Sequence, residues 1–178
     1  MYNTSLKYLL SPWIKNPPNR NILNLNTDSR NLIKGSLFIA ILGSKKDGRS
    51  FIYEAVGKKV AAILYETKNK ENHGICRYIN SIPIIYFFQL SENISNIAGR
   101  FYRQPGKKIK VIGVTGTNGK TTVTHLINQW SEILGNKAET IGTLGNGFLK
   151  SLSPTKNTTP SAIYIQSFLY EALKKKLN

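Results

Sequence analysis

The stretch VTGTNGKTT, residues 114–122, combines glycines with a Lys-Thr-Thr triplet. A glycine-rich turn between a strand and a helix binds phosphate well, because its backbone N–H groups and the positive end of the helix dipole favour anions. The strict phosphate-loop pattern G-x-x-x-x-G-K-[ST] requires glycine at position 114, where this chain has valine. The stretch is therefore either a variant phosphate loop or a chance Gly-Lys-Thr, and the apolar run before it and helical pattern after it favour the variant loop.

Each residue of this loop has an expected role in binding ATP and Mg²⁺. The backbone N–H groups that would surround a phosphate belong to Gly116, Thr117, Asn118, Gly119, Lys120 and Thr121. Lys120, the candidate catalytic residue, would place its ammonium against the β- and γ-phosphates. The Thr121 hydroxyl would bind Mg²⁺, and Thr122 would be an auxiliary donor. Gly113, Gly116 and Gly119 recur at every third position, where backbone can approach an oxygen or adopt a positive φ.

No acidic residue completes the metal site in the expected way. Beyond Lys120 the acidic residues are Glu132, Glu139 and Glu171, and none follows an apolar strand, where a metal-binding carboxylate is expected. The residues present predict nucleotide binding. They do not predict catalysis by this set of residues alone.

The elements around the loop alternate between strand and helix patterns. Compact apolar runs at 36–42, 59–66 and 82–88 have the length and composition of buried strands. A helical pattern separates the first two, and a second helix is expected after Ser91, which is a plausible N-cap. This alternation predicts an α/β fold in residues 1–105.

Residues 103–108, RQPGKK, form the expected linker to a second domain at 106–178. There we expect a strand at 109–116, a helix at 121–135, a strand at 138–145 and a helix at 162–176. The first of these helices carries one apolar stripe, formed by Val123, Leu126, Ile127, Trp130, Ile133 and Leu134. Two strands make only a marginal sheet, so this region reads as an incomplete phosphate-loop-type parallel α/β domain.

Composition limits the class of protein. One cysteine, Cys76, excludes an internal disulfide and suits a reducing compartment. No apolar run approaches the ~18 residues of a membrane helix, and the N-terminus lacks a signal-peptide pattern, so we expect a cytoplasmic protein without a membrane partner. The net charge of +16 would attract polyanions. The lysines are dispersed among Asn, Ile and Tyr, which share A/T-rich codons, so a basic nucleic-acid-binding module ranks as the alternative, together with a non-functional remnant.

The sequence GVTGTNGKTT resembles the ATP loop of the Mur ligases and their folylpolyglutamate synthase relatives, whose pattern is G-x-x-G-T-x-G-K-[TS]. This spacing removes the difficulty at Val114. Further stretches are similar, in order, to the branch of the family that adds the third peptide residue in peptidoglycan synthesis: LLSPWI, TDSR, GSLFIAILG, DGRSFI, IAGRFYRQP, GTLGNG and NTTPS. The resemblance covers essentially the whole chain.

The resemblance implies an ATP- and Mg²⁺-dependent amide ligase. In such enzymes an N-terminal domain holds the UDP-sugar, a central domain binds ATP, and a C-terminal domain binds the amino acid. The substrates implied are UDP-MurNAc-L-Ala-D-Glu and meso-diaminopimelate, with L-lysine as the alternative amino acid. The resemblance implies a monomer and no specific nucleic-acid partner. The rest of the central domain, with the family's carbamylated lysine and second metal ligand, and the amino-acid-binding domain have no counterpart, so the chain resembles the N-terminal portion of a ligase.

The resemblance also assigns site residues by position. ATP contacts fall on residues 116–122. Contacts to the UDP-MurNAc-dipeptide fall on Thr27, Ser29, Ser44, Lys45, Lys46, Asn157, Thr158 and Thr159. Position 27 is often leucine in the family, and Ser44-Lys45-Lys46 replaces a His-Gln-Ala type of loop. Contacts made by backbone atoms survive these differences, whereas side-chain contacts at these positions do not follow from the resemblance.

Overall fold

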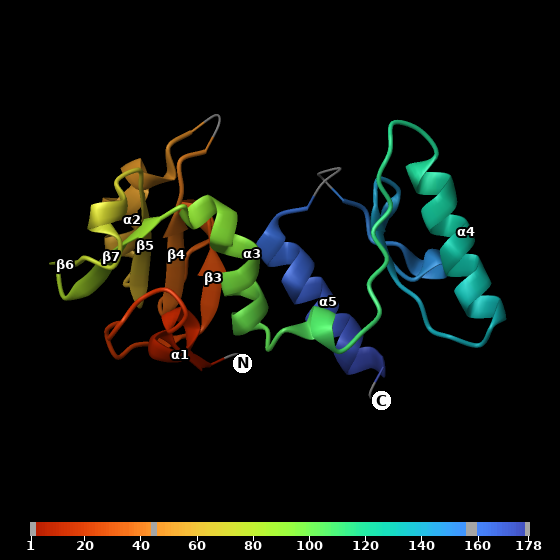
Figure 1. The fold of residues 1–178 in the computed structure, drawn as a ribbon, viewed down its shortest axis with the longest axis horizontal. Coiled ribbons are helices and arrows are strands. Elements are labelled where there is room, and N and C mark those ends of the chain that lie inside the picture. Colours follow the sequence, from red (N-terminus) through yellow and green to blue (C-terminus); the bar gives the residue numbers. More distant parts are fainter. Residues whose placement is uncertain (1–2, 44–45, 156–159, 177–178) are drawn as a thin grey trace. The chain divides into compact units, whose positions relative to one another are not determined.

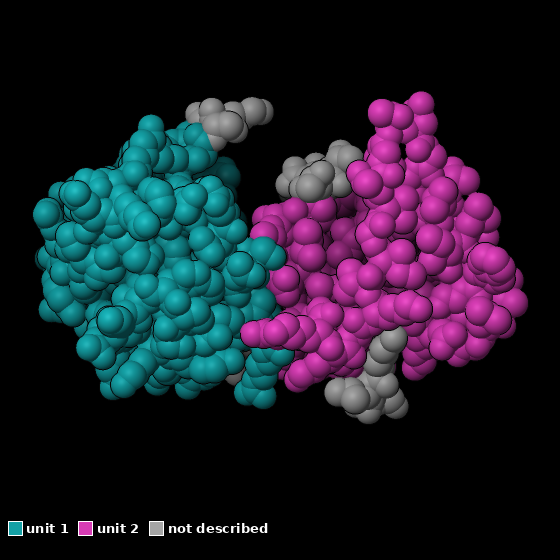
Figure 2. Space-filling model, viewed as in Figure 1, with its two compact units in different colours: residues 1–103 teal, residues 104–178 magenta. Residues whose placement is uncertain are grey.

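The computed structural model describes residues 3–43, 46–155 and 160–176 (Figure 1). The chain forms two compact units, Met1–Arg103 and Gln104–Asn178 (Figure 2). Their boundary lies at the start of the turn-rich stretch 103–108. Among the described helices, none combines the length and the apolar composition that crossing a membrane requires.

Unit 1 is built on a five-stranded sheet in the order β3-β4-β5-β7-β6. The strands are β3 (Asn24–Asn26), β4 (Ser36–Ala40), β5 (Ala62–Thr67), β7 (Ile82–Phe88) and β6 (Cys76–Ile79). The first four pair in parallel, and β6 pairs antiparallel with β7. The predicted α/β class is confirmed, as are strands within 36–42, 59–66 and 82–88. Within this sheet, the strands that the sequence did not predict are β3, which is short and polar, and β6, which lies at an edge of the sheet.

Helices cover both faces of this sheet. Side chains alternate along a strand, so Phe38 of β4 and Ile63 of β5 point to one face, where they pack with Ala55 and Val56 of α2 (Ile52–Gly57). Figure 1 shows α2 behind the sheet and α3 (Leu90–Phe101) in front of it. Helix α1 (Leu6–Leu10) contacts α3, and a short ribbon of β1 (Thr4–Ser5) and β2 (Asn21–Ile22) precedes the sheet.

The start of α3 differs from the prediction. The N-cap residue is Gln89, in a left-handed conformation, and its own side chain makes no capping hydrogen bond. Ser91 lies inside the helix, and its backbone N–H donates to Oε1 of the buried Glu66 at 2.8 Å. The prediction of Ser91 as N-cap was wrong because a carboxylate from β5 satisfies this end of the helix.

Unit 2 contains α4 (Lys120–Ile133), α5 (Ala162–Lys176) and a hairpin of β8 (Thr140–Gly142) with β9 (Gly145–Gly147). The predicted helices are confirmed, and the strand expected at 138–145 is instead most of this hairpin. The strand expected at 109–116 is absent, and Val111 and Ile112 are more than half exposed. A strand forms only by pairing, and among the described residues of unit 2 no strand pairs with this segment.

Candidate functional site

The loop at 116–122 has the geometry of an anion-binding helix start. Gly119 is the N-cap of α4, with φ 75°, and no side chain caps this end of the helix. Gly116 also has a positive φ, 147°. The first turn of α4 carries no acidic residue, and residues 115–122 are exposed. Uncapped N–H groups and the dipole of a 14-residue helix therefore face solvent, where a phosphate can reach them.

Gly113 does not share this role. Its φ is not positive, and nothing lies within 4 Å of the Cβ that another residue would place there. Gly113 therefore does not adopt the positive φ found at Gly116 and Gly119, and the approach of its backbone to a phosphate oxygen stays a prediction. In this loop the positive φ angles occur at the two glycines nearest the helix, Gly116 and Gly119.

The ammonium of Lys120 lies across the loop. Its Nζ donates to the carbonyl oxygen of Gly116 at 2.6 Å and to that of Thr117 at 3.1 Å. These bonds hold the charge beside the N–H groups of the helix start. Since the side chain is exposed, phosphate oxygens can replace the two carbonyl acceptors without exposing any buried group.

The loop fits triphosphate better than it fits a cation. Thr121, the predicted Mg²⁺ ligand, is exposed in the first turn of α4 and offers one hydroxyl. In the described parts of the chain, no group of three or more His, Cys, Asp or Glu side chains is arranged to hold a metal ion. A cation held by Thr121 would therefore need further ligands from the nucleotide or water.

The second group of predicted residues follows neighbouring strands of unit 1. Thr27 and Ser29 come after β3, and Lys46 comes in the connection after β4. Because β3 and β4 are parallel neighbours, the loops that follow them leave the sheet on the same side, at the carboxyl ends of the strands. This side is called the sheet edge below. In open α/β sheets this edge is where ligands bind. The other predicted contacts, Ser44, Lys45, Asn157, Thr158 and Thr159, lie outside the described residues.

Two Asp-x-Arg turns shape this edge. Asp28 accepts a bond from the backbone N–H of Arg30 and a forked pair from its guanidinium, with Nη2 at 2.7 Å from Oδ2. Asp47 and Arg49 repeat the arrangement after β4, with the corresponding distance 2.8 Å. In both turns the arginine side-chain bond lowers the pKa of the aspartate below its ordinary value of 3.8. The TDSR and DGR motifs are thus matched turns.

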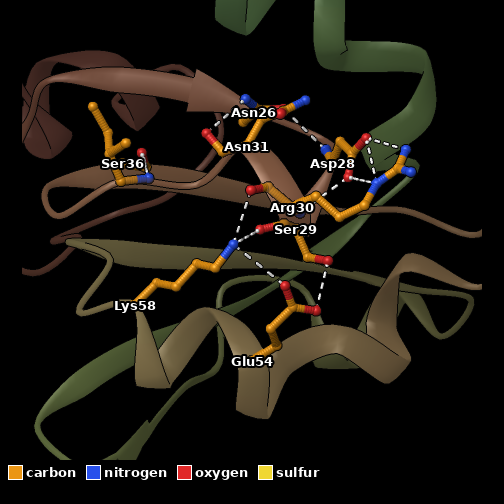
Figure 3. Close-up of polar contacts among 9 residues, drawn as sticks. Asn26, Asp28, Ser29, Arg30, Asn31, Ser36, Glu54 and Lys58 are labelled. Atoms are coloured by element: carbon orange, nitrogen blue, oxygen red, sulfur yellow. Dashed lines mark hydrogen bonds and ion pairs between the residues drawn. The ribbon is translucent and has the colours of Figure 1, made fainter.

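Ser29, between the two residues of the first fork, is tied to α2 rather than free. It is 5 % exposed, and its hydroxyl donates to Oε2 of Glu54 at 2.8 Å. Lys58 forms an ion pair with Oε1 of Glu54 and donates to the carbonyl oxygens of Ser29 and Arg30 (Figure 3). The i,i+4 spacing of Glu54 and Lys58 could have indicated their ion pair. Nothing in the sequence indicated that both side chains reach a turn 25 to 29 residues away.

A buried carboxylate joins the same sheet edge to α3. Glu66, at the end of β5, is 6 % exposed and accepts the backbone N–H of Leu42 at 2.7 Å and that of Ser91 at 2.8 Å. Leu42 lies just before the loop that contains Lys46. Glu66 therefore anchors one side of that loop, and it was missed because its two partners are backbone groups distant in sequence.

Comparison with known protein families decides what these two sites belong to. Residues 21–102 match the model described as "Mur ligase family, catalytic domain", and residues 114–178 match the "Mur ligase middle domain". The chain belongs to the Mur ligase family. The first match lies within unit 1 and the second within unit 2. The predicted family resemblance is confirmed. The interpretation of Val114 as a variant position of the loop stays a prediction.

Two relatives of this Mur ligase chain carry the same name, UDP-N-acetylmuramoyl-L-alanyl-D-glutamate–2,6-diaminopimelate ligase. The protein of Buchnera aphidicola from Schizaphis graminum is 63 % identical over 178 residues, which is 100 % of this chain and 36 % of that protein. The protein of Buchnera aphidicola subsp. Acyrthosiphon pisum is 62 % identical over 176 residues, 99 % of this chain and 35 % of that protein. The chain thus spans about a third of the length of these relatives.

Solved structures show the same fold at low identity. A 2,6-diaminopimelate ligase structure superposes with a TM-score of 0.71 at 23 % identity, covering 97 % of this chain and 34 % of that one. MurF from Acinetobacter baumannii gives a TM-score of 0.58 at 19 % identity, covering 95 % and 33 %. Both support the Mur ligase architecture of this chain.

Proposed function

We propose that this chain provides the UDP-sugar-binding part and the ATP phosphate loop of an amide ligase of peptidoglycan precursor synthesis. The reaction transfers the γ-phosphoryl group of ATP to a carboxylate of UDP-MurNAc-L-Ala-D-Glu, giving an acyl phosphate. The amine of meso-diaminopimelate attacks that carbonyl carbon, and inorganic phosphate leaves. The observation that carries this proposal is 63 % identity along the entire chain to a ligase named for these substrates.

The loop at 116–122 is proposed to bind the phosphates of ATP. Its backbone N–H groups would hold the phosphate oxygens, and Lys120 would exchange the carbonyls of Gly116 and Thr117 for the β- and γ-phosphates. These groups supply positioning and charge neutralisation. Thr121 is proposed to hold Mg²⁺, which supplies charge neutralisation on the phosphates when bound. A MurF structure from Thermotoga maritima in complex with ADP supports nucleotide binding in this family.

The sheet edge of unit 1 is proposed to bind the UDP-sugar through Thr27, Ser29 and the loop 44–46. The Ser29 hydroxyl already donates to Glu54, so it has lone pairs but no proton to offer the ligand. Ligand acceptors would therefore be served by the backbone of this turn. We place the protein in the cytoplasm, where the free thiol of Cys76 stays reduced, and expect a monomer.

Calorimetric titration of the full chain tests both binding sites separately. We expect saturable binding of UDP-MurNAc-L-Ala-D-Glu and, independently, of ATP with Mg²⁺. Lys120→Ala should abolish ATP binding and leave UDP-sugar binding unchanged, and Lys150→Ala, an exposed lysine outside the loop, should change neither. Absence of saturable UDP-sugar binding at millimolar concentration would refute the role of unit 1. Salt-sensitive binding displaced equally by any polyanion would instead indicate the nucleic-acid alternative.

A further inference from the structure

Unit 1 contains an open pocket of about 650 Å³ that lies away from the sheet edge. Its walls are the end of α2, the connection from α2 to β5, and the turn between β6 and β7. Because β5 and β7 run parallel and begin at Ala62 and Ile82, these walls stand at the amino ends of the strands. Thr27, Ser29 and Lys46 follow carboxyl ends, so the pocket is at the opposite end of the sheet from the residues proposed for the UDP-sugar.

The floor of the pocket is apolar. Val56 and Val60 are 8 % and 3 % exposed, and Ile82, which lines the same pocket, is half-buried. Tyr53 of α2 also lines the pocket and is 77 % exposed, so most of its ring surface is in contact with water. A volume of this size and an apolar lining are typical of sites for small organic ligands. A ligand with a ring or a branched apolar group would cover the floor and the Tyr53 ring together.

The charged groups of the pocket are both cations. Arg20 and Lys59 line it, and its described lining contains no acidic residue. Nη2 of Arg20 donates to the carbonyl oxygen of Ser81 at 2.7 Å, and the backbone carbonyl of Arg20 accepts from the N–H of Leu6 at 2.8 Å. A guanidinium carries five N–H donors, so the bond to Ser81 fixes its direction and leaves donors for an anion. Among the described residues, neither Arg20 nor Lys59 forms an ion pair.

Lys59 carries its side chain at a position that favours glycine. It follows Lys58, the C-cap residue of α2, and has a φ of 55°, the left-handed conformation in which helices commonly end at glycine. A side chain in this conformation costs free energy, whereas glycine adopts it freely. The end of α2 therefore favours glycine at position 59, and what lysine adds there is an ammonium group at the pocket. Backbone strain of this kind is concentrated at sites where a side chain serves a ligand.

We propose that this pocket binds a small organic anion, with an apolar or aromatic body on Val56, Val60 and Tyr53 and a carboxylate or phosphate group between Arg20 and Lys59. Two features of the lining carry this inference together, the pair of cations without an acidic partner and the apolar floor beside an exposed ring. An inorganic anion would leave the floor in water, and a neutral ring would leave the two cations unpaired. The inference does not depend on the proposed function, because none of these residues belongs to the two ligand sites proposed above.

Amide NMR titration of the full chain with four small probes tests the proposal. Phenylpropionate and phenyl phosphate carry a ring and an anionic group, benzyl alcohol carries the ring alone, and inorganic phosphate carries the charge alone. We expect saturable shifts at Gly57, Lys59 and Ser81 with at least one of the ring-bearing anions, and affinities about tenfold weaker for the other two probes. The preferred ring-bearing anion shows whether the site takes a carboxylate or a phosphate. Because shifts are read residue by residue, binding of phenyl phosphate at 116–122 is measured separately.

Two results of this titration would overturn the proposal. One is the absence of saturable shifts at these three amides with either ring-bearing anion at millimolar concentration. The other is equal affinity for inorganic phosphate or for benzyl alcohol, which would show that the pocket recognises only charge or only apolar surface.

Variants of the two cations separate binding from folding. Lys59→Gly removes the ammonium and the conformational cost together, so binding of the ring-bearing anion should weaken about tenfold while the temperature of thermal unfolding stays the same or rises. Arg20→Gln removes the guanidinium and should weaken binding to a similar extent. Lys68→Gln changes an exposed lysine outside the pocket and should leave binding unchanged. Wild-type affinity in Lys59→Gly, or equal loss in all three variants, would contradict the proposal.

Discussion

The hydroxyl of Ser29 donates a 2.8 Å hydrogen bond to Oε2 of Glu54, and so joins the turn after β3 to the helix α2. Lys58 strengthens this connection through the carbonyls of Ser29 and Arg30 and the carboxylate of Glu54. Helix α2 therefore holds the Asp28–Arg30 turn in place through Ser29 and the backbone of that turn. Glu54, which is not among the proposed ligand contacts, can in this way control the position of Ser29, which is.

Replacing Glu54 by alanine should weaken binding of UDP-MurNAc-L-Ala-D-Glu about tenfold, because a loss near 1.4 kcal/mol corresponds to a factor of ten. The turn loses its anchor, and Lys58 loses its ion-pair partner. Glu54→Gln keeps an acceptor for Ser29, so its affinity should lie between those of the wild type and of Glu54→Ala. Calorimetry measures the affinities, with the exposed Glu71→Gln as control. Wild-type affinity in Glu54→Ala would show that the turn holds its shape alone.

Gly119→Ala should lower the affinity for ATP about fivefold. At φ 75° a Cβ costs roughly 1 kcal/mol of backbone strain, and no neighbouring atom lies within 4 Å to add a clash. Gly113→Ala is the matched control, because its backbone φ is not positive and its surroundings are equally open. Equal losses in both variants, measured by the same titration, would mean that flexibility rather than left-handed geometry is what the loop requires.

Glu66→Gln should reduce the free energy of unfolding of unit 1 by about 2 kcal/mol. The amide can accept only one of the two N–H groups, from Leu42 and Ser91, and its own NH₂ opposes the other. Urea unfolding followed by the fluorescence of Trp13, which packs against Phe87, measures the change in a Trp130→Phe background. Glu92→Gln, at an exposed position of α3, is the control. A change below about 0.5 kcal/mol would show that the loop and helix do not rely on this carboxylate.

Acid should loosen the two Asp-x-Arg turns only at low pH. The folded-state pKa values of Asp28 and Asp47 lie below 3.8, so their contribution is complete above that value and is lost as the pH falls through the folded pKa. Carboxyl NMR titration should give both pKa values below 3.8. Arg49→Met should return the pKa of Asp47 toward 3.8 and leave that of Asp28 unchanged. Titration of Asp47 at 3.8 in the unmodified protein would contradict the forked geometry.

Much of the fold followed from local patterns. The runs that became β4, β5 and β7 are apolar enough to be buried on both faces, and α4 and α5 follow from spacing within single helices. The strand expected at 109–116 did not form: its residues favour a strand, but β8 and β9 pair with each other and no strand of the described part of unit 2 pairs with this segment. The prediction of Ser91 as N-cap was wrong because the backbone N–H of Ser91 lies inside the helix and donates to the carboxylate of Glu66.

The candidate phosphate loop could be predicted from the sequence alone, since glycine content, the start of a helix and the charge of a lysine are local properties. Which glycines adopt positive φ was decided by the structure, as were the partners of Ser29 and Glu66. Those partners lie about 25 residues away or supply only backbone groups, so they cannot be predicted from the types of side chain at short spacing. Long-range hydrogen bonds and the exposure of the α4 stripe depend on how elements meet, which the tertiary structure decides.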